Sequence, residues 1–530
     1  MIDILDLTAD VLVIGGGPAG AWAALKAVQS GADVVLVDKG YLGTSGATAS
    51  AGTGVWYVQP EAGAREAAMA SRENLNGHLS DRRWMARVLD QTYANINELA
   101  DAGRYPFPAL ADGGELRRGV QGPEYMRRMR AWLKRSGVRI LDHSPVLELL
   151  TDPAGAVAGA AGHRRQIDQP YRVRAGAVVL ATGGCAFLSR ALGCDVNTGD
   201  GALFAAEVGA ALSGMEFSNA YAIAPEFSTV TKTAYYSYAS FFREDGSVLE
   251  GAGSQRGRSV IARELLHARV FARLDKADAA VQAAMRLGQP NFFLPFDRMR
   301  INPFTDRFPI TLLLEGTVRG TGGVRIIDEH CSTGVPGLYV AGDVATRELI
   351  CGGFTGGGSH NSAWAMSSGT WAGVAAARHA TVLGPAARRR RLSPAGQAGL
   401  RPTGTATDNS ADLVRAVQAE THPYDKNYLR RGEVLTGALA TLNEHWSDAR
   451  AHLRGADAVA ARQAAAMLAH ARWMYTAALA RPETRGMHKR LDHPGTDPAL
   501  RHRLVVGGLD ELWSSPDPVR PHTPLDLAVA

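Results

Sequence analysis

The sequence predicts an α/β protein in which a parallel sheet is covered by helices, and three short apolar segments carry this prediction. Residues 11–14, 177–180 and 338–340 are apolar runs that are each followed closely by glycine. Unbroken apolar runs of this length are typical of parallel strands that are buried on both faces. Because the three runs lie far apart in the chain, we expect one nucleotide-binding domain assembled from discontinuous pieces.

The first forty residues form the most informative unit, in the order strand, glycine turn, helix, strand and acid. In Gly15-Gly-Gly-Pro-Ala-Gly20, the first glycine permits a tight turn, Gly17 lets the backbone approach a pyrophosphate, and Gly20 lets the helix pack against the strand. The helix expected from about 18 to 30 points its N-terminal N–H groups at the phosphates. Asp38 follows the second strand, where a carboxylate accepts hydrogen bonds from ribose hydroxyls. The unit predicts dinucleotide binding, and the alternative is an ordinary tight turn.

Length and composition bound the class of protein. At 530 residues the chain exceeds the size of one usual core, so we expect two or three domains. The 57 basic residues exceed the 52 acidic ones only slightly, which gives no indication of a nucleic-acid partner. The four cysteines form no C-x-x-C pair, so they are expected to be reduced and structural, with no iron–sulfur cluster in this chain.

The sequence also lacks the signals of a membrane protein. No run of about eighteen uninterrupted apolar residues occurs, and the N-terminus lacks the basic region of a signal peptide. We therefore expect no transmembrane segment and a cytoplasmic protein, while attachment to a membrane through another subunit stays open.

Composition also predicts a nucleotide-binding domain and an insert within it. Residues 1–214 and 336–383 hold the three glycine-ended strands, together with strands of an accessory sheet expected at 138–150 and 171–173. The aromatic-rich insert at 215–335 is expected to form an α+β cap that closes a substrate cleft.

The C-terminal part is expected to be separate. Residues 384–409 are rich in proline, glycine, threonine and arginine and are interpreted as a linker. Residues 410–530 are expected to form a helical domain and a tail. The Arg388–Arg391 run is interpreted as a solvated patch rather than an anion site.

Further segments are placed to contact the same ligand. The stretch 41–54 consists mostly of small residues, which let a backbone lie against a flat ligand, and a flexible surface loop is the alternative. Thr182 and Gly183 end the second strand, and Asp343 ends the third, where its carboxylate suits the ribityl hydroxyls of a flavin. The segment 352–362 supplies another helix N-terminus.

Taken in order, these segments resemble the flavoprotein subunit family of fumarate reductase and succinate dehydrogenase, which also contains L-aspartate oxidase and the alpha subunit of adenylylsulfate reductase. The likeness runs over nearly the whole chain, which looks like a divergent member. Besides the glycine unit, the matching motifs are Ala181-Thr-Gly-Gly184, Asn197-Thr-Gly-Asp-Gly-Ala202, Gly209-Ala-Ala-Leu212, Met215-Glu-Phe217, Arg258-Ser-Val-Ile-Ala-Arg263, Thr321-Gly-Gly-Val324, Gly337-Leu-Tyr-Val-Ala-Gly-Asp343 and Arg481-Pro-Glu-Thr-Arg-Gly-Met-His488.

The resemblance implies FAD and an α/β fold with a Rossmann-like FAD-binding domain, an inserted α+β capping domain and a C-terminal helical domain. FAD is expected to be noncovalent, because Gly46 stands where succinate and fumarate enzymes have the histidine that attaches FAD. The positions expected to bind FAD are Gly15, Gly17, Ala19, Gly20, Asp38, Lys39, Ser45, Gly46, Ala47, Thr182, Gly183, Asp200, Asp343, Asn361 and Ser362.

Three departures from the family's pattern bear on the substrate. Tyr221 replaces a substrate-binding histidine, Val318 replaces a second one, and residues 356–362 lack the family's substrate-clamping arginine. A dicarboxylate is normally held by charge-assisted hydrogen bonds, and a buried unpaired charge costs roughly several kcal/mol. Fumarate and succinate are therefore predicted to be poor substrates. The segments around Gly46 and 356–360 look closer to the adenylylsulfate reductase branch.

Three residues are candidates for catalysis. Arg258 matches the arginine that serves the family opposite the flavin, which implies that it binds or protonates the substrate; a salt bridge within the cap with Glu264 or a neighbour is the alternative. His360, beside Asn361, is a candidate for a polar contact to the isoalloxazine ring or the substrate. Tyr221 is a candidate proton donor. Both His360 and Tyr221 have a purely structural role as the alternative.

The sequence thus predicts an FAD-dependent oxidoreductase that transfers a hydride between flavin N5 and a small organic substrate, in the cleft between the flavin domain and the cap. One alternative is a flavoprotein subunit of the adenylylsulfate reductase type, which needs a separate ferredoxin-like or iron–sulfur partner. Another is a flavin-binding protein whose catalytic site has decayed, which the missing histidines favour.

Overall fold

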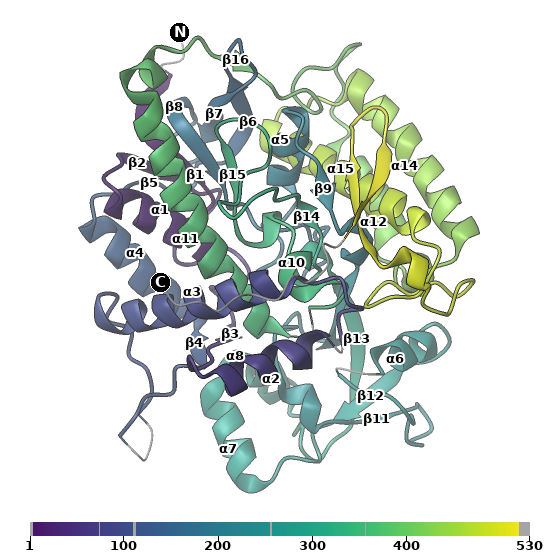
Figure 1. Cartoon of the computed structure of the whole chain (residues 1–530). Helices are drawn as coiled ribbons and strands as arrows, with labels where there is room; N and C mark the ends of the chain where they lie inside the picture. The colour runs from purple at the N-terminus through teal and green to yellow at the C-terminus, as the bar shows by residue number, and fades with distance from the viewer. Residues whose placement is uncertain (1–3, 74, 110–112, 255–256, 356, 519–530) are drawn as a thin grey trace.

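The computed structural model describes residues 4–73, 75–109, 113–254, 257–355 and 357–518. Residues 519–530 of the predicted tail, and Gly356 of the 356–362 motif, lie outside the described residues. Figure 1 shows three groups of elements: a large sheet with its helices, a smaller unit in teal below it, and a group of helices in yellow-green beside it.

The largest sheet has eight strands and contains all three glycine-ended segments. In its parallel part, β1 (Leu5–Ile14) lies between β2 (Val34–Val37) and β8 (Gln169–Leu180) and pairs with both. Strand β5 (Arg139–Leu141) pairs with β2, and β15 (Leu338–Val340) pairs with β8. Because these strands are parallel, their carboxyl ends lie at the same edge of the sheet. The three segments that the sequence marked are therefore brought together there.

An antiparallel extension continues this sheet beyond β8. Its strands are β7 (Val157–Arg164), β6 (Val146–Thr151) and β16 (Ser393–Pro394). The prediction of a separate short strand at 171–173 is wrong, because Tyr171 to Leu180 is one unbroken stretch of β8 that pairs with β1 throughout its length. The accessory strands are an extension of the main sheet.

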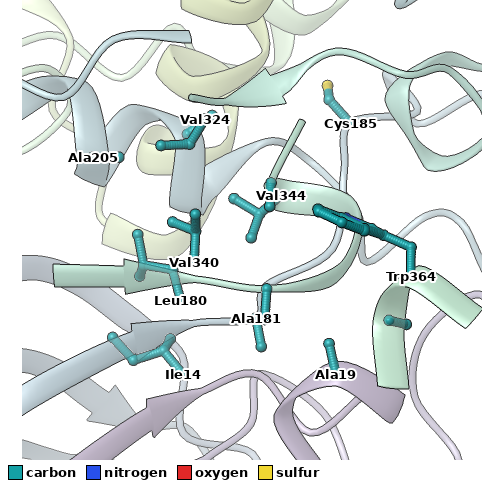
Figure 2. Close-up of a cluster of buried hydrophobic side chains, with 14 of the residues drawn as sticks. Ile14, Ala19, Leu180, Ala181, Cys185, Ala205, Val324, Val340, Val344 and Trp364 are labelled. Carbon is teal, nitrogen blue, oxygen red and sulfur yellow. The ribbon is translucent and has the colours of Figure 1, made fainter. Parts of the chain in front are cut away.

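Helices α1 (Pro18–Gln29) and α11 (Gly358–Leu383) pack on this sheet and on each other (Figure 1). A Cβ at Gly369 or Gly373 of α11 would clash with the backbone of α1, so glycine permits the close contact. Figure 2 shows the buried side chains at the strand ends: Ala181 and Val344 lie between Ile14, Leu180 and Val340 of the strands and Ala19 and Trp364 of the two helices. The other helices of this part are α2 (Ala62–Glu73), α3 (Arg82–Asp101), α4 (Gly122–Arg135), α5 (Asp200–Glu207) and α10 (Glu348–Cys351).

Within the predicted cap lies a second sheet, which is antiparallel and has the strand order β10-β13-β12-β11. Its elements are β10 (Ala220–Pro225), β11 (Ser240–Phe242), α6 (Arg258–Leu265), β12 (Val270–Arg273), α7 (Ala279–Gly288), α8 (Pro290–Met299), β13 (Phe308–Glu315) and α9 (Gly316–Arg319). The aromatic residues of the insert form its core, since Phe292 packs edge-on against Tyr235 and Tyr236. Figure 1 shows this unit below the main sheet.

The C-terminal part contains helices and a hairpin. The helices are α12 (Ser410–Thr421), α13 (Tyr424–Asn427), α14 (Gly432–His452) and α15 (Ala458–Ala480). The hairpin of β17 (His502–Gly507) and β18 (Trp513–Pro518) pairs with β9 (Leu212–Ser213), and β9 pairs with β14 (Gly323–Val324). The C-terminal part is thus mainly helical, as expected, and its last described residues add a hairpin whose β17 is paired to β9 in the rest of the chain.

Several short elements complete the fold. They are β3 (Gly52–Gly54), which pairs with β4 (Gly119–Gln121), and the 3-10 helices η1 (Met215–Phe217), η2 (Tyr235–Tyr238), η3 (Gly342–Val344), η4 (Gly384–Arg389) and η5 (Pro498–Leu500). No helix in the described part of the chain has both the length and the apolar character needed to cross a bilayer.

The predicted linker is anchored to the main sheet. Arg390 donates hydrogen bonds to the carbonyl oxygens of Ala175 (2.5 Å) and Gly176 (3.1 Å) and pairs with Asp152 (3.2 Å). The interpretation of the arginine run as a solvated patch is thus wrong for Arg390, whereas Arg389 and Arg391 are exposed. Arg390 thus attaches the linker to backbone oxygens of β8 although both of its neighbours are exposed. The sequence gives no signal for this contact.

Candidate active site

A cavity of about 560 Å³ lies where the carboxyl ends of the parallel strands face the cap. The main sheet contributes the glycine turn after β1, the small-residue stretch after β2, and the ends of β8 and β15. The cap contributes residues of β10, of the 231–237 segment, of α6 and of α9. Residues predicted to bind the cofactor and residues predicted to bind the substrate therefore line the same cavity.

The glycine turn between β1 and α1 depends on two close backbone approaches. Gly15 has φ 108°, and a Cβ there would clash with the carbonyl group of Ala181. A Cβ at Gly20 would clash with the carbonyl oxygen of Gly15. Gly17 differs, because a Cβ there would meet no atom within 4 Å and the residue lines the cavity. The backbone of Gly17 is therefore open to a ligand.

Asp38, at the end of β2, lines the cavity and also holds the surrounding loops. One carboxylate oxygen accepts a hydrogen bond from the backbone N–H of Gly16 (2.5 Å). The other accepts from the N–H of Gly40 (2.7 Å) and from Ser45 Oγ (2.8 Å). A carboxylate has about four acceptor sites, so capacity for a ligand hydroxyl remains.

Lys39 and Asp200 form an ion pair in the cavity wall. Lys39 Nζ lies 2.6 Å from Asp200 Oδ2 and donates a second hydrogen bond to Thr198 Oγ1 at 2.9 Å. The pair joins the end of β2 to the start of α5, so these two predicted contacts of FAD neutralise one another.

Two polar atoms, one at the end of β8 and one at the start of α11, have no partner among the described residues. Thr182 Oγ1 and Asn361 Oδ1 are buried and have no hydrogen-bond partner among the described residues. Asn361 is oriented by its Nδ2 atom, which donates to Val318 O at 3.0 Å, and Ser362 Oγ donates to Gly54 O at 2.6 Å. Buried polar atoms are nearly always satisfied, so both atoms indicate a ligand here.

Asp343, at the end of β15, is paired with a residue that the sequence analysis missed. Arg347 Nη1 donates to Asp343 Oδ1, and its Nη2 donates to the carbonyl oxygens of Thr317 (3.3 Å), Val318 (3.2 Å) and Gly320. Burial raises the pKa of Asp343, and Arg347 opposes that shift. The four-residue separation of Asp343 and Arg347 was the only signal in the sequence.

These observations fit FAD. Of the fifteen positions predicted to bind it, all except Gly20 line the cavity, and Gly20 has the packing role predicted for it. The open glycine backbone, the strand-end carboxylates and the unpaired polar atoms suit a dinucleotide with phosphate, ribose and ring polar groups.

Arg258, at the start of α6, faces the cavity from the cap. Its Nη1 donates to Tyr221 O at 2.7 Å and its Nη2 donates to Ser254 O, while its buried Nε has no partner among the described residues. Burial lowers its pKa. The alternative salt bridge does not form, because Glu264 pairs with Arg243 at 3.4 Å.

Three further charged residues line the cap side of the cavity and were not predicted: Lys232, Glu315 and Arg319. Glu315 is fully buried; its Oε1 accepts from Thr231 Oγ1 at 2.6 Å, and its Oε2 has no hydrogen-bond partner among the described residues. Burial opposes ionisation, yet the nearby cations, Arg319 and Lys232 foremost, together with the hydrogen bond from Thr231 outweigh it and lower the pKa of Glu315. The four-residue spacing of Glu315 and Arg319 at a strand end was the available signal.

The prediction that His360 contacts the flavin or the substrate is not supported. Ser359 and Asn361 line the cavity, whereas His360 does not; its ring packs on Trp56 with 4.6 Å between centroids. Burial lowers the pKa of His360 to about 3, so the ring is neutral. On α11 the side chains of neighbouring residues point in different directions, which turns His360 away from the wall.

Tyr221 is a packing residue rather than a proton donor. Its hydroxyl lies 2.8 Å from Thr421 O and 2.9 Å from His422 O, and its ring packs edge-on against Tyr424 and Tyr428. Burial raises its pKa well above the usual value. The hydroxyl therefore joins the cap to the C-terminal helices, and its catalytic assignment is corrected on this geometry.

Two protein families match separate parts of the chain, and individual relatives match longer stretches of it. Residues 10–225 match the family described as FAD binding domain, and residues 427–511 match the one described as fumarate reductase flavoprotein C-term. L-aspartate oxidase of Streptomyces coelicolor is 27% identical over 550 residues, which covers 94% of this chain and 91% of that protein. L-aspartate oxidase of Rhodospirillum rubrum is 31% identical over 232 residues, which covers 43% of this chain and 74% of that protein. The chain belongs to the flavoprotein family of fumarate reductase and L-aspartate oxidase.

Membership of this flavoprotein family confirms the predicted enzyme class and cofactor: the protein is an FAD-dependent oxidoreductase. The fold agrees. A point mutant of the E. coli quinol fumarate reductase flavoprotein superimposes with a TM-score of 0.82 at 20% identity, and the match covers 98% of each chain. The predicted α/β fold class is thereby confirmed, and the alternative of a decayed flavin-binding protein loses its support.

Proposed function

We propose that this FAD-dependent oxidoreductase acts on a small organic anion that also carries an N–H donor, as an amino acid does. Bound FAD supplies the redox chemistry by accepting or giving a hydride. The residues of the chain bind and orient the substrate. The observation that carries the proposal is that unpaired donors and an unpaired acceptor lie together on the cap side of the cavity.

The donors are guanidinium groups. Arg258 is fixed by two backbone carbonyl oxygens, and its Nε remains unpaired among the described residues. A rigid, permanently charged guanidinium is suited to bind a carboxylate through charge-assisted hydrogen bonds. We therefore propose that Arg258 binds and orients the acidic group of the substrate.

The acceptor is Glu315. Its Oε2 has no hydrogen-bond partner within the described part of the chain; Arg319 Nε lies 3.5 Å from Oε2, and Lys232 Nζ lies 3.7 Å from Oε1. An ionised carboxylate in this position attracts an ammonium group. This supports a zwitterionic substrate and gives a new reason why fumarate and succinate should be poor ones, because neither offers an N–H.

The names of the relatives agree with this substrate class, since the two relatives above are L-aspartate oxidases. Lys232 and Arg319 supply positive charge from other positions, so loss of the three family anchors does not leave the cap side of the cavity without cations.

The contacts to FAD and the domain division are part of the proposal. We assign FAD to the fourteen cavity-lining positions named above and propose that it is noncovalent, because Gly46 has no side chain to attach it. We propose residues 1–214 and 336–383 as the FAD-binding domain, 215–335 as the cap, 384–409 as the linker and 410–530 as the C-terminal domain. Acid precipitation should release all of the FAD into the supernatant.

The substrate class is tested by anaerobic reduction of the bound flavin. We expect an amino acid such as L-aspartate, L-glutamate or L-alanine to bleach the flavin absorbance, and succinate to leave it oxidised. Bleaching by succinate at a rate equal to the fastest amino acid would contradict the proposal, and so would failure of every amino acid in a full panel.

An electron-transfer partner is a separate proposal. A ferredoxin-like or iron–sulfur protein would accept electrons from the reduced holoprotein in place of oxygen. Stopped-flow reoxidation with a ferredoxin, compared with air-saturated buffer, distinguishes the two acceptors.

A further inference from the structure

A small apolar cluster, separate from the main core, borders the cavity. Its members are Leu79, Phe217, Ala220, Met487 and the partly buried Phe354. Leu79 and Phe217 are completely buried, whereas Ala220 (7% exposed), Met487 (8%) and Phe354 keep exposed surface and line the cavity. Apolar surface in contact with water is unfavourable, so these three residues favour a ligand that turns an apolar group towards them.

The cluster lies next to the position proposed for the acidic group of the substrate. Ala220 directly precedes Tyr221 in β10, and Tyr221 O accepts a hydrogen bond from Arg258 Nη1 at 2.7 Å. The carbonyl group that fixes Arg258 and the apolar surface therefore belong to consecutive residues of one strand. A substrate whose carboxylate is held by Arg258 can extend its carbon chain towards this surface.

Close backbone contacts hold Phe354 and Met487 beside each other. Met487 N donates to Gly353 O at 2.8 Å, and a Cβ at Gly486 would clash with the same carbonyl group. A Cβ at Gly353 would in turn meet the ring of Phe217. These contacts fix the residues before and after the glycines, so the apolar surface is preformed.

No charged side chain belongs to this surface in the part of the chain that the structure describes. The charged residues that line the cavity come from other segments; they are Asp38, Lys39, Asp200, Lys232, Arg258, Glu315, Arg319 and Asp343. Arg485, two residues before Met487, does not line the cavity and is bound to Glu483. A carboxylate placed against this surface would lose hydration without gaining a partner.

We propose that Ala220, Phe354 and Met487 form an apolar subsite, which takes the side chain of the substrate while Arg258 binds its acidic group. This inference rests on the proposed function and deepens it, because it makes the substrate an amino acid with an apolar rather than an acidic side chain. Phe354 and Met487 are then specificity-determining residues. The chain would differ in substrate from the L-aspartate oxidases to which it is similar.

The subsite is tested with straight-chain monocarboxylates, from acetate to pentanoate, which carry a carboxylate and a growing apolar chain but no amino group. The holoprotein is titrated with each, and the perturbation of the flavin spectrum gives the affinity. We expect the affinity to rise about fourfold for each added methylene, as burial of a methylene group does. L-Norvaline should likewise reduce the flavin at lower concentration than L-alanine, and both at lower concentration than L-aspartate.

Substitutions of Met487 separate the chemistry of the subsite from structural damage. Met487→Gln keeps the length of the side chain but adds a polar end, so the gain per methylene should fall below about twofold. Met487→Leu conserves apolar character and should keep most of the gain. Met299→Gln is the matched control, because Met299 is an exposed methionine of the cap. FAD content and circular dichroism confirm that each holoprotein is intact.

Arg258→Lys tests the other half of the arrangement. It should weaken all of the monocarboxylates by a similar factor and leave the dependence on chain length unchanged, because Arg258 contacts the carboxylate and the cluster contacts the chain. A steeper loss for pentanoate than for acetate in Arg258→Lys would contradict this division.

The inference is overturned if wild-type affinity is flat across the series, or if Met487→Gln keeps the dependence of the wild type. It is also overturned if Met487→Gln weakens FAD binding and leaves that dependence intact, since the cluster would then face the flavin. These outcomes are distinct from failure of the proposed function. If no amino acid bleaches the flavin but the chain-length dependence requires Met487, the subsite stands and the amino-acid substrate is wrong.

Discussion

Arg347 and Asp343 form a partly buried ion pair that joins the FAD side of the cavity to its cap side. The arginine side chain is 1% exposed, and its other nitrogen binds carbonyl oxygens of the turn that carries Arg319. A single side chain thus positions the carboxylate at the end of β15 and the backbone of α9. Arg347 therefore connects the FAD side and the cap side of the site.

Replacement of Arg347 by methionine should therefore affect both halves. The change leaves the partly buried Asp343 without its partner; breaking a fully buried pair typically costs about 3–5 kcal/mol of unfolding free energy, and the cost here should lie at the lower end of that range. We expect a loss of this size in urea denaturation, together with weaker FAD binding in fluorescence titration. Arg391→Met, at an exposed position of the linker, is the control. Unchanged stability of Arg347→Met would show that the pair is dispensable.

Alanine at two glycines should separate ligand approach from packing. At Gly17 the added Cβ meets no protein atom, so apoprotein stability should change by less than about 1 kcal/mol while FAD affinity falls about tenfold or more. At Gly20 the Cβ clashes with the carbonyl oxygen of Gly15, and the apoprotein should lose about 1–3 kcal/mol. Equal effects of both changes on the apoprotein would contradict this division.

Glu348 predicts a pH dependence of stability. Its carboxyl group is buried; Ser213 Oγ donates to Oε1, and Oε2 has no partner among the residues described. Burial raises the pKa of Glu348 to about 7, with Arg503 opposing and Glu216 reinforcing the shift. The folded state therefore binds this proton more tightly than the unfolded state does, and stability falls as pH rises from the ordinary glutamate pKa towards 7.

The size of this effect is about 3 kcal/mol by linkage, lost progressively up to about pH 7 and constant above it. We expect Glu348→Gln to flatten the dependence, so that the variant gains stability relative to wild type at pH 8 and not at pH 4. Urea denaturation of both proteins across this range measures it. Parallel pH profiles for the two proteins would show that Glu348 does not titrate in the native range.

Tyr221 and Arg258 should respond differently to conservative substitution. Tyr221→Phe removes a buried hydroxyl bonded to backbone oxygens, so it should cost about 1 kcal/mol of stability and leave flavin reduction within about twofold of wild type. Arg258→Lys loses the planar donor geometry and should slow substrate-driven flavin reduction about 100-fold or more. Stopped-flow reduction measures both; a large rate loss in Tyr221→Phe would restore its catalytic assignment.

The FAD half of the site could be predicted because its signals are local. In 10–39, strand, turn, helix and acid follow one another within about thirty residues, and each glycine has a backbone reason that holds in any protein with this unit. The ends of β8 and β15 carry the same type of signal, and the parallel sheet brings them together. The two strands predicted at 171–173 and 177–180 are one strand, because Tyr171 and Leu180 both lie in β8.

The cap half could not be predicted in the same way. His360 and Tyr221 have the residue types of catalytic groups. The ring of His360, however, packs on Trp56, and the hydroxyl of Tyr221 is hydrogen-bonded to backbone carbonyl oxygens. Lys232 carries no motif, and the only signal for Arg319 is its four-residue spacing from Glu315. Whether a side chain lines a cavity depends on how separate segments pack against each other, and this packing cannot be predicted from the spacing of residues along the chain.

The sequence by itself determined the cofactor and the chemistry, because dinucleotide binding is encoded in short contiguous motifs whose backbone geometry is fixed by neighbouring residues. Only the tertiary structure decided which charges face the substrate. Lys232, Arg258 and Glu315 come from three separate segments of the cap, and their charge balance exists only once these segments are folded against the end of the parallel sheet.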